Sequence, residues 1–219
     1  AFEWIHFPKN QNELDAATTR LKFEELFFLQ LSLLQLKFNR RETVIGYNFT
    51  KIGDYFNTFY HQMLAFELTD AQKRVLKEIR RDLATGKQMN RLLQGDVGSG
   101  KTVVGFMTML MALDNGFQAL LMAPTEILAQ QHYAGLSIFG EQLGIQVAFL
   151  TGSVKGKKRN EVLAGLENGD IAIVIGTHAL LEDPVRFKNL GLAITDEQHR
   201  FGVEQRSKLW HKSKPYPPH

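Results

Sequence analysis

The sequence predicts an α/β fold, in which a parallel sheet is flanked by helices and a separate α-helical segment precedes it. From about residue 66 onwards, short apolar runs alternate with longer stretches of helical periodicity, which is typical of a parallel sheet covered on both faces. Between residues 13 and 38, Leu recurs mostly at intervals of three, four or seven residues, which predicts one or two long helices with a broad apolar face. We therefore expect a helical segment over residues 1–60 and an α/β domain over residues 61–219.

Each element of the α/β part is expected from a local pattern. Thr69, followed three residues later by Gln72, has the form of a capping box that opens a helix, and Gly86 is the expected stop of that helix. The short apolar runs expected to form strands are 91–94, 119–123, 146–150, 171–175 and 192–195. The helices expected between and after them lie near 101–114, 126–142, 157–167 and 203–211.

The helical segment differs from the rest of the chain in composition. Residues 1–60 hold 9 of the 16 Phe residues. Such an excess of Phe and Leu favours packing against a neighbouring domain over a ligand-binding box.

Charge is distributed unevenly along the chain. The formal net charge of +3 is too small to indicate nucleic-acid binding by itself. Residues 73–91 nevertheless carry a net +5, whereas residues 103–150 contain no Lys or Arg. This pattern predicts a buried core with a rim that faces a polyanion, and solvated helix faces remain the alternative.

Composition also excludes several classes of protein. The chain has no Cys, which excludes a disulfide scaffold and a Cys-based zinc site and is compatible with the reducing cytoplasm. Its longest nearly apolar run, residues 103–113, is about half of the ~20 residues that a membrane-spanning helix needs. We expect a cytoplasmic protein with no membrane partner.

A glycine-rich octapeptide lies between the first predicted strand and the helix predicted over 101–114. It matches the phosphate-binding loop pattern and comprises Gly95, Asp96, Val97, Gly98, Ser99, Gly100, Lys101 and Thr102. Glycines let backbone N–H groups close around phosphate oxygens at a helix N-terminus. Lys101 is expected to reach the β- and γ-phosphates, and the Thr102 hydroxyl is expected to bind Mg²⁺.

Two acids end the last predicted strand. Asp196 at the carboxyl end of a parallel strand is expected to supply a second Mg²⁺ contact, and Glu197 to act as general base for an attacking water. Two acids after a strand are more often a helix cap, but the phosphate loop about 95 residues upstream favours hydrolysis of ATP or GTP.

Asp196, Glu197, Gln198 and His199 together resemble the signature of the superfamily 2 helicases and translocases. The resemblance implies a RecA-like P-loop NTPase lobe that uses ATP and Mg²⁺, with Phe66 and Gln72 reading the adenine, and with Gln198 and His199 coupling the nucleotide state to DNA. It also implies three DNA-contacting motifs after successive strands, made of Pro124, Thr125 and Glu126, of Thr151, Gly152 and Ser153, and of Gly176, Thr177 and His178. Singly, each of these motifs resembles an ordinary helix cap.

Longer stretches of the sequence indicate one family within this superfamily. Residues 89–102 and 196–206, with Ile5–Pro8 and Arg20–Phe27, resemble the RecG family of bacterial branched-DNA helicases. The transcription-repair coupling translocases are similar, but they typically carry Glu at position 198 and an aromatic residue at position 99. The resemblance implies an ATP-driven remodeller of branched double-stranded DNA. Its expected partners are a second RecA-like lobe and an N-terminal wedge domain.

The same resemblance implies that a Thr-Ala-Thr strand of the family follows soon after His219 and lies between the phosphate-loop strand and the Asp-Glu strand. We therefore expect a gap in the central sheet of this chain.

Two other functions remain open at this point. One is a nucleotide-dependent DNA-binding module without turnover of its own, and the other is a lobe of a transcription-repair coupling translocase. A kinase is a weaker alternative, because it explains neither Gln198 and His199 nor the three motifs after the strands.

Overall fold

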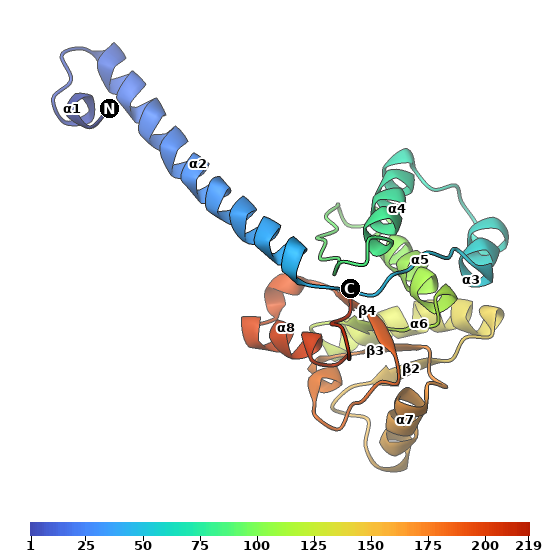
Figure 1. Cartoon of the computed structure of the whole chain (residues 1–219). Coiled ribbons are helices and arrows are strands. Elements are labelled where there is room, and N and C mark those ends of the chain that lie inside the picture. The colour runs from blue at the N-terminus through green and yellow to red at the C-terminus, as the bar shows by residue number, and fades with distance from the viewer. The chain divides into compact units, whose positions relative to one another are not determined.

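The computed structural model describes residues 1–219, except for the side chains of residues 37 and 40–43 (Figure 1). The chain forms two compact units, Ala1–Val44 and Ile45–His219.

The first unit consists of the short helix α1 (Phe2–His6) and the long helix α2 (Gln11–Thr43). The Asn10 side chain accepts a hydrogen bond from the Glu13 N–H, which satisfies one of the free donors at the start of α2. The predicted long helix is confirmed. Its aromatic residues Phe23 and Phe28 are 58% and 60% exposed, so this unit does not bury them. Among the described residues, no helix is both long and apolar enough to cross a membrane.

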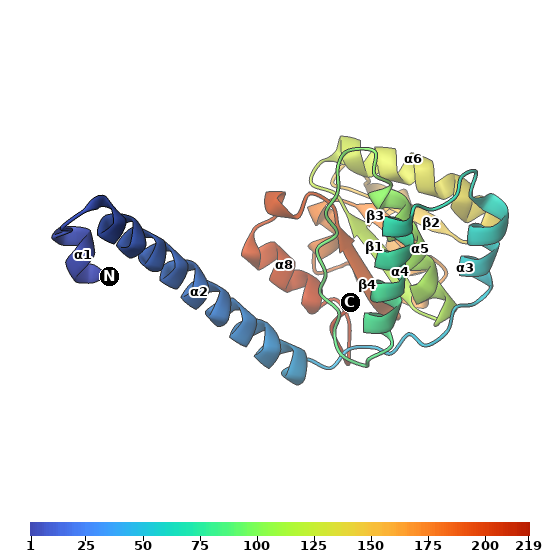
Figure 2. The same ribbon diagram turned by 90° about the horizontal axis from the view of Figure 1, so that it is seen from above.

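The second unit contains a four-stranded parallel sheet in the order β2-β3-β1-β4 (Figure 2). The strands are β1 (Gln118–Met122), β2 (Val147–Leu150), β3 (Ile173–Gly176) and β4 (Leu190–Thr195). The longer helices are α4 (Asp70–Leu83), α5 (Lys101–Asp114), α6 (Glu126–Leu143), α7 (Gly156–Asn168) and α8 (Val203–Trp210). The shorter ones are α3 (Asp54–Thr58), a π-helix (Phe59–Met63) and two 3₁₀ turns, η2 (His178–Leu181) and η3 (Gln198–Arg200). The α/β fold with a parallel sheet and flanking helices is thus confirmed.

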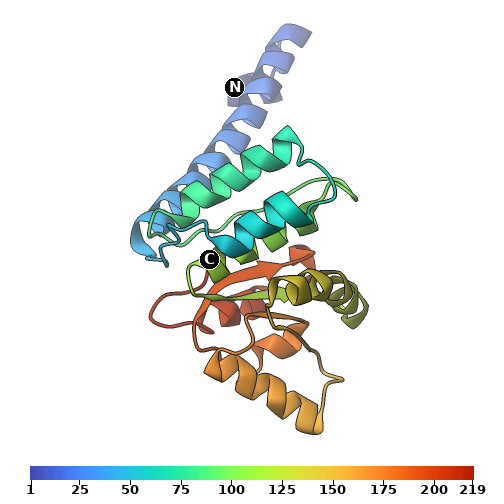
Figure 3. The same cartoon turned by 90° about the vertical axis from the view of Figure 1, so that its right-hand side faces the viewer.

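Helices cover both faces of the sheet, with α4 and α5 on one side and α7 on the other (Figure 3). Alternate residues of β1 face opposite ways: Leu121 packs into the cluster that includes α4 and α5, whereas Leu120 packs into the cluster that includes α7. Every residue of α5 from Phe106 to Leu113 is buried, which explains why this part of the helix carries no cation.

The start of the second unit is tied to the sheet domain before α4 begins. Tyr47, Phe49 and Phe59 are buried in the same core as α5. The Asp114 carboxylate, at the end of α5, accepts hydrogen bonds from the N–H groups of Gly53, Tyr55 and Phe56 at the start of α3. Residues 45–60 therefore pack with the α/β unit. The division at residue 60 stays a prediction about the intact protein.

The strand predicted over residues 91–94 is wrong for this structure, because these residues join no ladder. The edge of β4, beside which the Thr-Ala-Thr strand of the family is expected, is occupied by His219, whose N–H donates to the Gly191 carbonyl and whose carbonyl accepts from the Ala193 N–H. The Met89 N–H in turn donates to His219 Nδ1 at 2.9 Å. An apolar run becomes a strand only where a neighbour offers hydrogen bonds, and residues 91–94 have none beside them.

Candidate nucleotide and DNA site

The carboxyl ends of all four strands meet at one edge of the sheet. Met122 is in register with both Gly176 and Thr195, and Leu150 is in register with Gly176. Since the strands are parallel, the segments that follow them emerge side by side. The predicted motifs after β1, β2, β3 and β4 are therefore brought together, although up to 75 residues separate them in the sequence.

The phosphate loop reaches the same edge. Helix α5 begins at Lys101 and packs against β4, where a Cβ added to Gly105 would lie 3.5 Å from Ile194 Cδ1. Gly105 lies about one turn after Lys101, and Ile194 lies two residues before Asp196. This packing places the start of α5 at the end of β4. No hydrogen bond or ion pair joins Lys101 or Thr102 to the two acids in the described part of the chain.

Glycine is required within the loop for conformational reasons. Gly98 and Gly100 have φ values of +80° and +79°, which lie in the left-handed region. The Lys101 ammonium donates hydrogen bonds to the Gly95 and Asp96 carbonyls at 2.7 and 2.8 Å, so it lies folded over the loop. Val97, at the tip of the loop, is fully exposed.

Gln72 links α4 to the phosphate loop. Its Oε1 accepts from the Thr69 N–H at 2.8 Å, which completes the predicted capping box with Thr69 Oγ1. Its Nε2 donates to the Ser99 carbonyl at 2.9 Å. One lone pair and one N–H of the amide remain for a base. Phe66, four residues before the helix begins, is 52% exposed.

Asp196 has a partner that the sequence did not indicate. Its Oδ2 lies 2.9 Å from His132 Nε2, and its Oδ1 accepts from the Glu197 N–H at 3.0 Å. His132 lies on α6, two helical turns after Thr125, which caps that helix. The spacing of seven residues, about two turns, puts His132 on the same face of α6 as Thr125. This spacing could have suggested that His132 lies near the site, but it does not indicate Asp196 as the partner.

Glu197 has a strained backbone. It is the sole non-glycine residue with positive φ, at +48°, in the described part of the chain. Such conformations are concentrated at functional sites, where the surrounding structure holds them. The Glu197 carboxylate lies 3.6 Å from His199 Nδ1, and the Gln198 side chain accepts from Arg206 at 3.3 Å. Gln198 therefore contacts α8, and His199 contacts the acid pair through Glu197.

The motifs after β1 and β2 contact each other. Thr125 Oγ1 caps α6 by accepting from the Leu128 N–H. The Ser153 hydroxyl donates to the Glu126 carboxylate and lies 2.9 Å from Thr151 Oγ1. These bonds hold the two loops together at the sheet edge.

The predicted DNA contacts differ in accessibility. Five of them are exposed, Thr125, Glu126, Gly152, Ser153 and His178, and Pro124 is half-buried. Gly176, Thr151 and Thr177 are buried, so they shape the loops rather than present side chains to a partner. At Gly176 an added Cβ would overlap the Leu150 carbonyl, so only glycine fits there.

The loop suits a triphosphate with Mg²⁺. Lys101 and Thr102 are the first residues of α5, and their N–H groups have no acceptor in a preceding turn. The Asp196 carboxylate retains lone pairs beside its two hydrogen bonds. No cluster of three or more His, Asp or Glu residues that would hold a metal occurs among the described residues. Mg²⁺ at nucleotide sites is usually bound by one or two carboxylates together with water and substrate phosphates, and Asp196 offers one such carboxylate.

Comparisons with known proteins agree with this geometry. A family profile described as "DEAD/DEAH box helicase" matches residues 69–215, more than half of the chain. The chain is 49% identical over 209 residues to "ATP-dependent DNA helicase RecG" of Synechocystis sp., covering 95% of this chain and 25% of that protein. It is 47% identical to the RecG proteins of Thermotoga maritima and Bacillus subtilis, covering 98% and 97% of this chain and 27% and 31% of theirs. The chain thus spans between a quarter and a third of the length of these relatives.

A solved structure of RecG bound to a three-way DNA junction superposes with a TM-score of 0.78 at 46% identity, over 92% of this chain and 27% of that one. A hypothetical ATP-dependent RNA helicase from Sulfolobus tokodaii superposes with a TM-score of 0.56 at 18% identity, over 76% of this chain and 49% of that one, and shows the shared fold alone. The chain therefore belongs to the DEAD/DEAH box helicase family, and within it to the RecG helicases.

Proposed function

We propose that this chain is the first RecA-like motor lobe of an ATP-driven bacterial DNA helicase that remodels branched double-stranded DNA. The observation that carries the proposal is the meeting, at one edge of a parallel sheet, of the phosphate loop at the start of α5 and the acid pair at the end of β4. The RecG structure on a three-way junction supports branched DNA as the substrate.

In this proposal, separate residues of the chain bind ATP, hold Mg²⁺ and activate water. The loop N–H groups and Lys101 bind the β- and γ-phosphates of ATP, and the Thr102 hydroxyl and Asp196 hold Mg²⁺, which supplies charge neutralisation when bound. Glu197 accepts the proton of the attacking water. Phe66 and Gln72 hold the adenine.

DNA is held without reading its sequence. The exposed residues of the motifs after β1, β2 and β3 offer hydroxyls and backbone N–H groups at the same edge of the sheet. Gln198 and His199 couple the presence of ATP or ADP in the site to the conformation of these DNA-contacting loops. In the intact protein, a second RecA-like lobe and a wedge domain complete the helicase. We expect the helicase to act in the bacterial cytoplasm.

The test is the Lys101→Ala variant of the intact protein. Removing the ammonium takes away the positive side chain that the proposal places on the β- and γ-phosphates, so DNA-stimulated ATP hydrolysis is expected to fall by about 10²-fold or more. Phosphate release would be measured with forked, linear duplex and single-stranded DNA, with Lys51→Ala as the matched control for an exposed lysine.

The wild-type protein is expected to respond most to forked DNA. Stronger stimulation by single strands than by forks would contradict the substrate. Tight ATP-dependent DNA binding without any turnover would instead identify a nucleotide-dependent binding module.

A further inference from the structure

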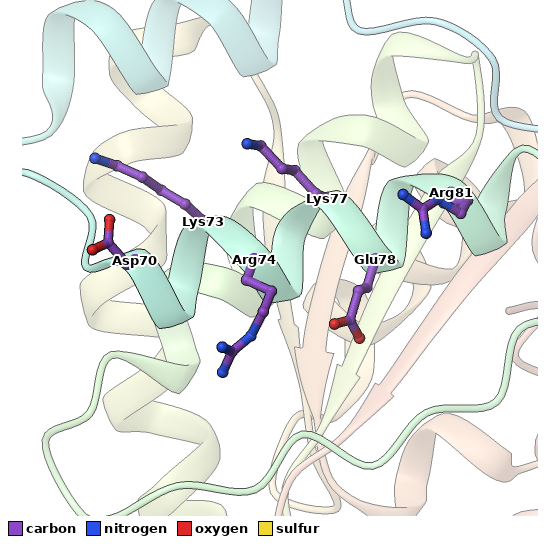
Figure 4. Close-up of a pocket in the computed structure, with 6 residues that line it drawn as sticks. All are labelled: Asp70, Lys73, Arg74, Lys77, Glu78 and Arg81. Atoms are coloured by element: carbon purple, nitrogen blue, oxygen red, sulfur yellow. The ribbon is translucent and has the colours of Figure 1, made fainter.

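Helix α4 presents a row of cations that the function proposed above does not use. Lys73, Lys77 and Arg81 follow one another at intervals of four residues and extend from the same side of the helix (Figure 4). With Asp70, Arg74 and Glu78 they line a shallow hollow of about 370 Å³. At 1.5 Å per residue, the row is about 12 Å long.

Among the described residues, the cations of α4 have no partner. No ion pair or side-chain hydrogen bond engages Lys73, Arg74, Lys77, Arg80 or Arg81 in the described part of the chain. Four of the five are exposed, and Lys73 is half-buried. They do not support the fold through charge pairing.

Two of the three acids of α4, Glu78 and Asp82, are bound by Arg91, a cation from outside the helix. Arg91 donates to the Asp82 carboxylate at 2.6 Å and to the Glu78 carboxylate at 2.9 Å. Chiefly through the Asp82 bond, these contacts raise the pKa of Arg91. Asp70, in the first turn, is the one acid of α4 not bound by a cation in the described part of the chain. The outer face of α4 is therefore more basic than its composition indicates.

The surroundings restrict the kind of ligand. Within α4 itself no large hydrophobic side chain is exposed in the described structure, and the exposed Phe66 and Leu92 lie outside the helix in the sequence. Cores of protein interfaces are enriched in aromatic residues, and single-stranded nucleic acids are held by stacking on aromatic rings. The row of cations on α4 has no exposed aromatic ring among it. It therefore suits the phosphate backbone of a duplex, which carries one negative charge per ~1.7 Å of its axis.

We propose that the outer face of α4, comprising Lys73, Arg74, Lys77 and Arg81, is a sequence-independent contact for the phosphate backbone of double-stranded DNA. It adds a second contact to the loops at the sheet edge. The inference rests on the proposed function, because a protein that does not act on DNA would not use such a contact.

The test compares two triple variants of the intact protein. Lys73→Gln, Lys77→Gln and Arg81→Gln remove the row, whereas Lys22→Gln, Lys51→Gln and Arg186→Gln remove three cations dispersed over the surface. Duplex affinity would be measured between 50 and 300 mM salt, with ATP binding as the check that the nucleotide site is intact.

Loss of the row is expected to weaken duplex binding roughly tenfold at low salt and to reduce the slope of log K against log salt by about 3, one per phosphate contact. The dispersed variant should keep the wild-type slope. A Lys73→Arg, Lys77→Arg variant should keep it too, because it retains both charges.

An unchanged slope in the α4 variant would overturn the inference while leaving the proposed function intact. If wild-type protein failed to bind duplex DNA at all, the proposed function would fail with it. Loss of binding to a polyglutamate peptide, with duplex binding unchanged, would assign the face to an acidic protein segment and also overturn the DNA contact.

Discussion

At the scale of single residues, the side chains of the site are held by contacts that are distant in sequence. Asp196 meets His132 across 64 positions, and Gln72 meets the Ser99 carbonyl across 27. The first contact links the proposed metal ligand to the helix whose N-terminus carries a proposed DNA motif. The second links α4 to the loop that receives phosphate. The sequence predicted that Asp196 and Gln72 belong to the site, but it did not predict the contacts that orient their side chains.

His132 is therefore expected to position Asp196. In the His132→Ala variant the carboxylate loses a hydrogen bond that fixes its rotamer, and outer partners of metal ligands typically contribute 10- to 100-fold. We expect the Mg²⁺ concentration for half-maximal ATP hydrolysis to rise at least about tenfold.

A His132→Asn variant retains a side-chain hydrogen-bonding group and should recover part of the effect. His61→Ala, at an exposed histidine remote from Asp196 in sequence, is the control. An unaltered Mg²⁺ dependence in His132→Ala, with the fold intact, would show that the contact does not position Asp196.

At the scale of elements, close approach of α6 to β2 depends on one glycine. A Cβ added to Gly140 would lie 2.5 Å from Val147 Cγ2 and 3.1 Å from the Ile145 carbonyl. Gly135, on the same helix, is exposed and has nothing within 4 Å of such a Cβ. The two glycines look alike in the sequence, but only the first is required by packing.

Alanine at these two positions should act in opposite directions. Gly140→Ala forces α6 away from β2 and is expected to lower the free energy of unfolding by about 1–3 kcal/mol. Gly135→Ala should raise it by about 0.5–1 kcal/mol, because alanine favours helix. Denaturant unfolding of both variants checks this, and equal shifts would contradict the packing argument.

At the scale of the whole α/β unit, His219 joins segments from three parts of the chain. Its Nδ1 accepts from the Met89 N–H at 2.9 Å, its Nε2 lies 2.8 Å from the Tyr47 carbonyl, and its backbone pairs with β4. Accepting at Nδ1 requires the neutral ring, with the proton on Nε2. Burial lowers the pKa of His219 below its ordinary 6.5, and the bond to Tyr47 only partly opposes this.

This lowered pKa predicts a pH dependence of stability. Between the folded pKa and 6.5, the unfolded chain binds the proton more readily. The stabilisation of the folded state by the neutral His219 ring is therefore fully present above about pH 6.5. It is lost as the pH falls from 6.5 through the folded pKa. We expect the Tm to drop less between pH 7.5 and 5.5 in His219→Gln than in the wild-type protein. Equal drops in both proteins would argue against the neutral ring in the folded state.

Much of the fold followed from local patterns. The Thr69–Gln72 cap, α5, and the strands β1 to β4 lie within a few residues of the predicted ranges. Each depends on spacing, capping or alternation that is complete within a short segment. The strand predicted over 91–94 failed because a strand also needs a neighbour, and that neighbour is a matter of tertiary pairing.

The sequence by itself determined the chemistry: a glycine loop with Lys101 and Thr102, an acid pair after an apolar strand, and hydroxyl motifs after three other strands. These are properties of residue type and spacing. Only the tertiary structure decided the strand order, the meeting of Asp196 with His132, and the engagement of Glu78 and Asp82 by Arg91 rather than by the cations of α4. Contacts between residues far apart in the chain depend on how helices and strands pack, and no local spacing encodes that packing.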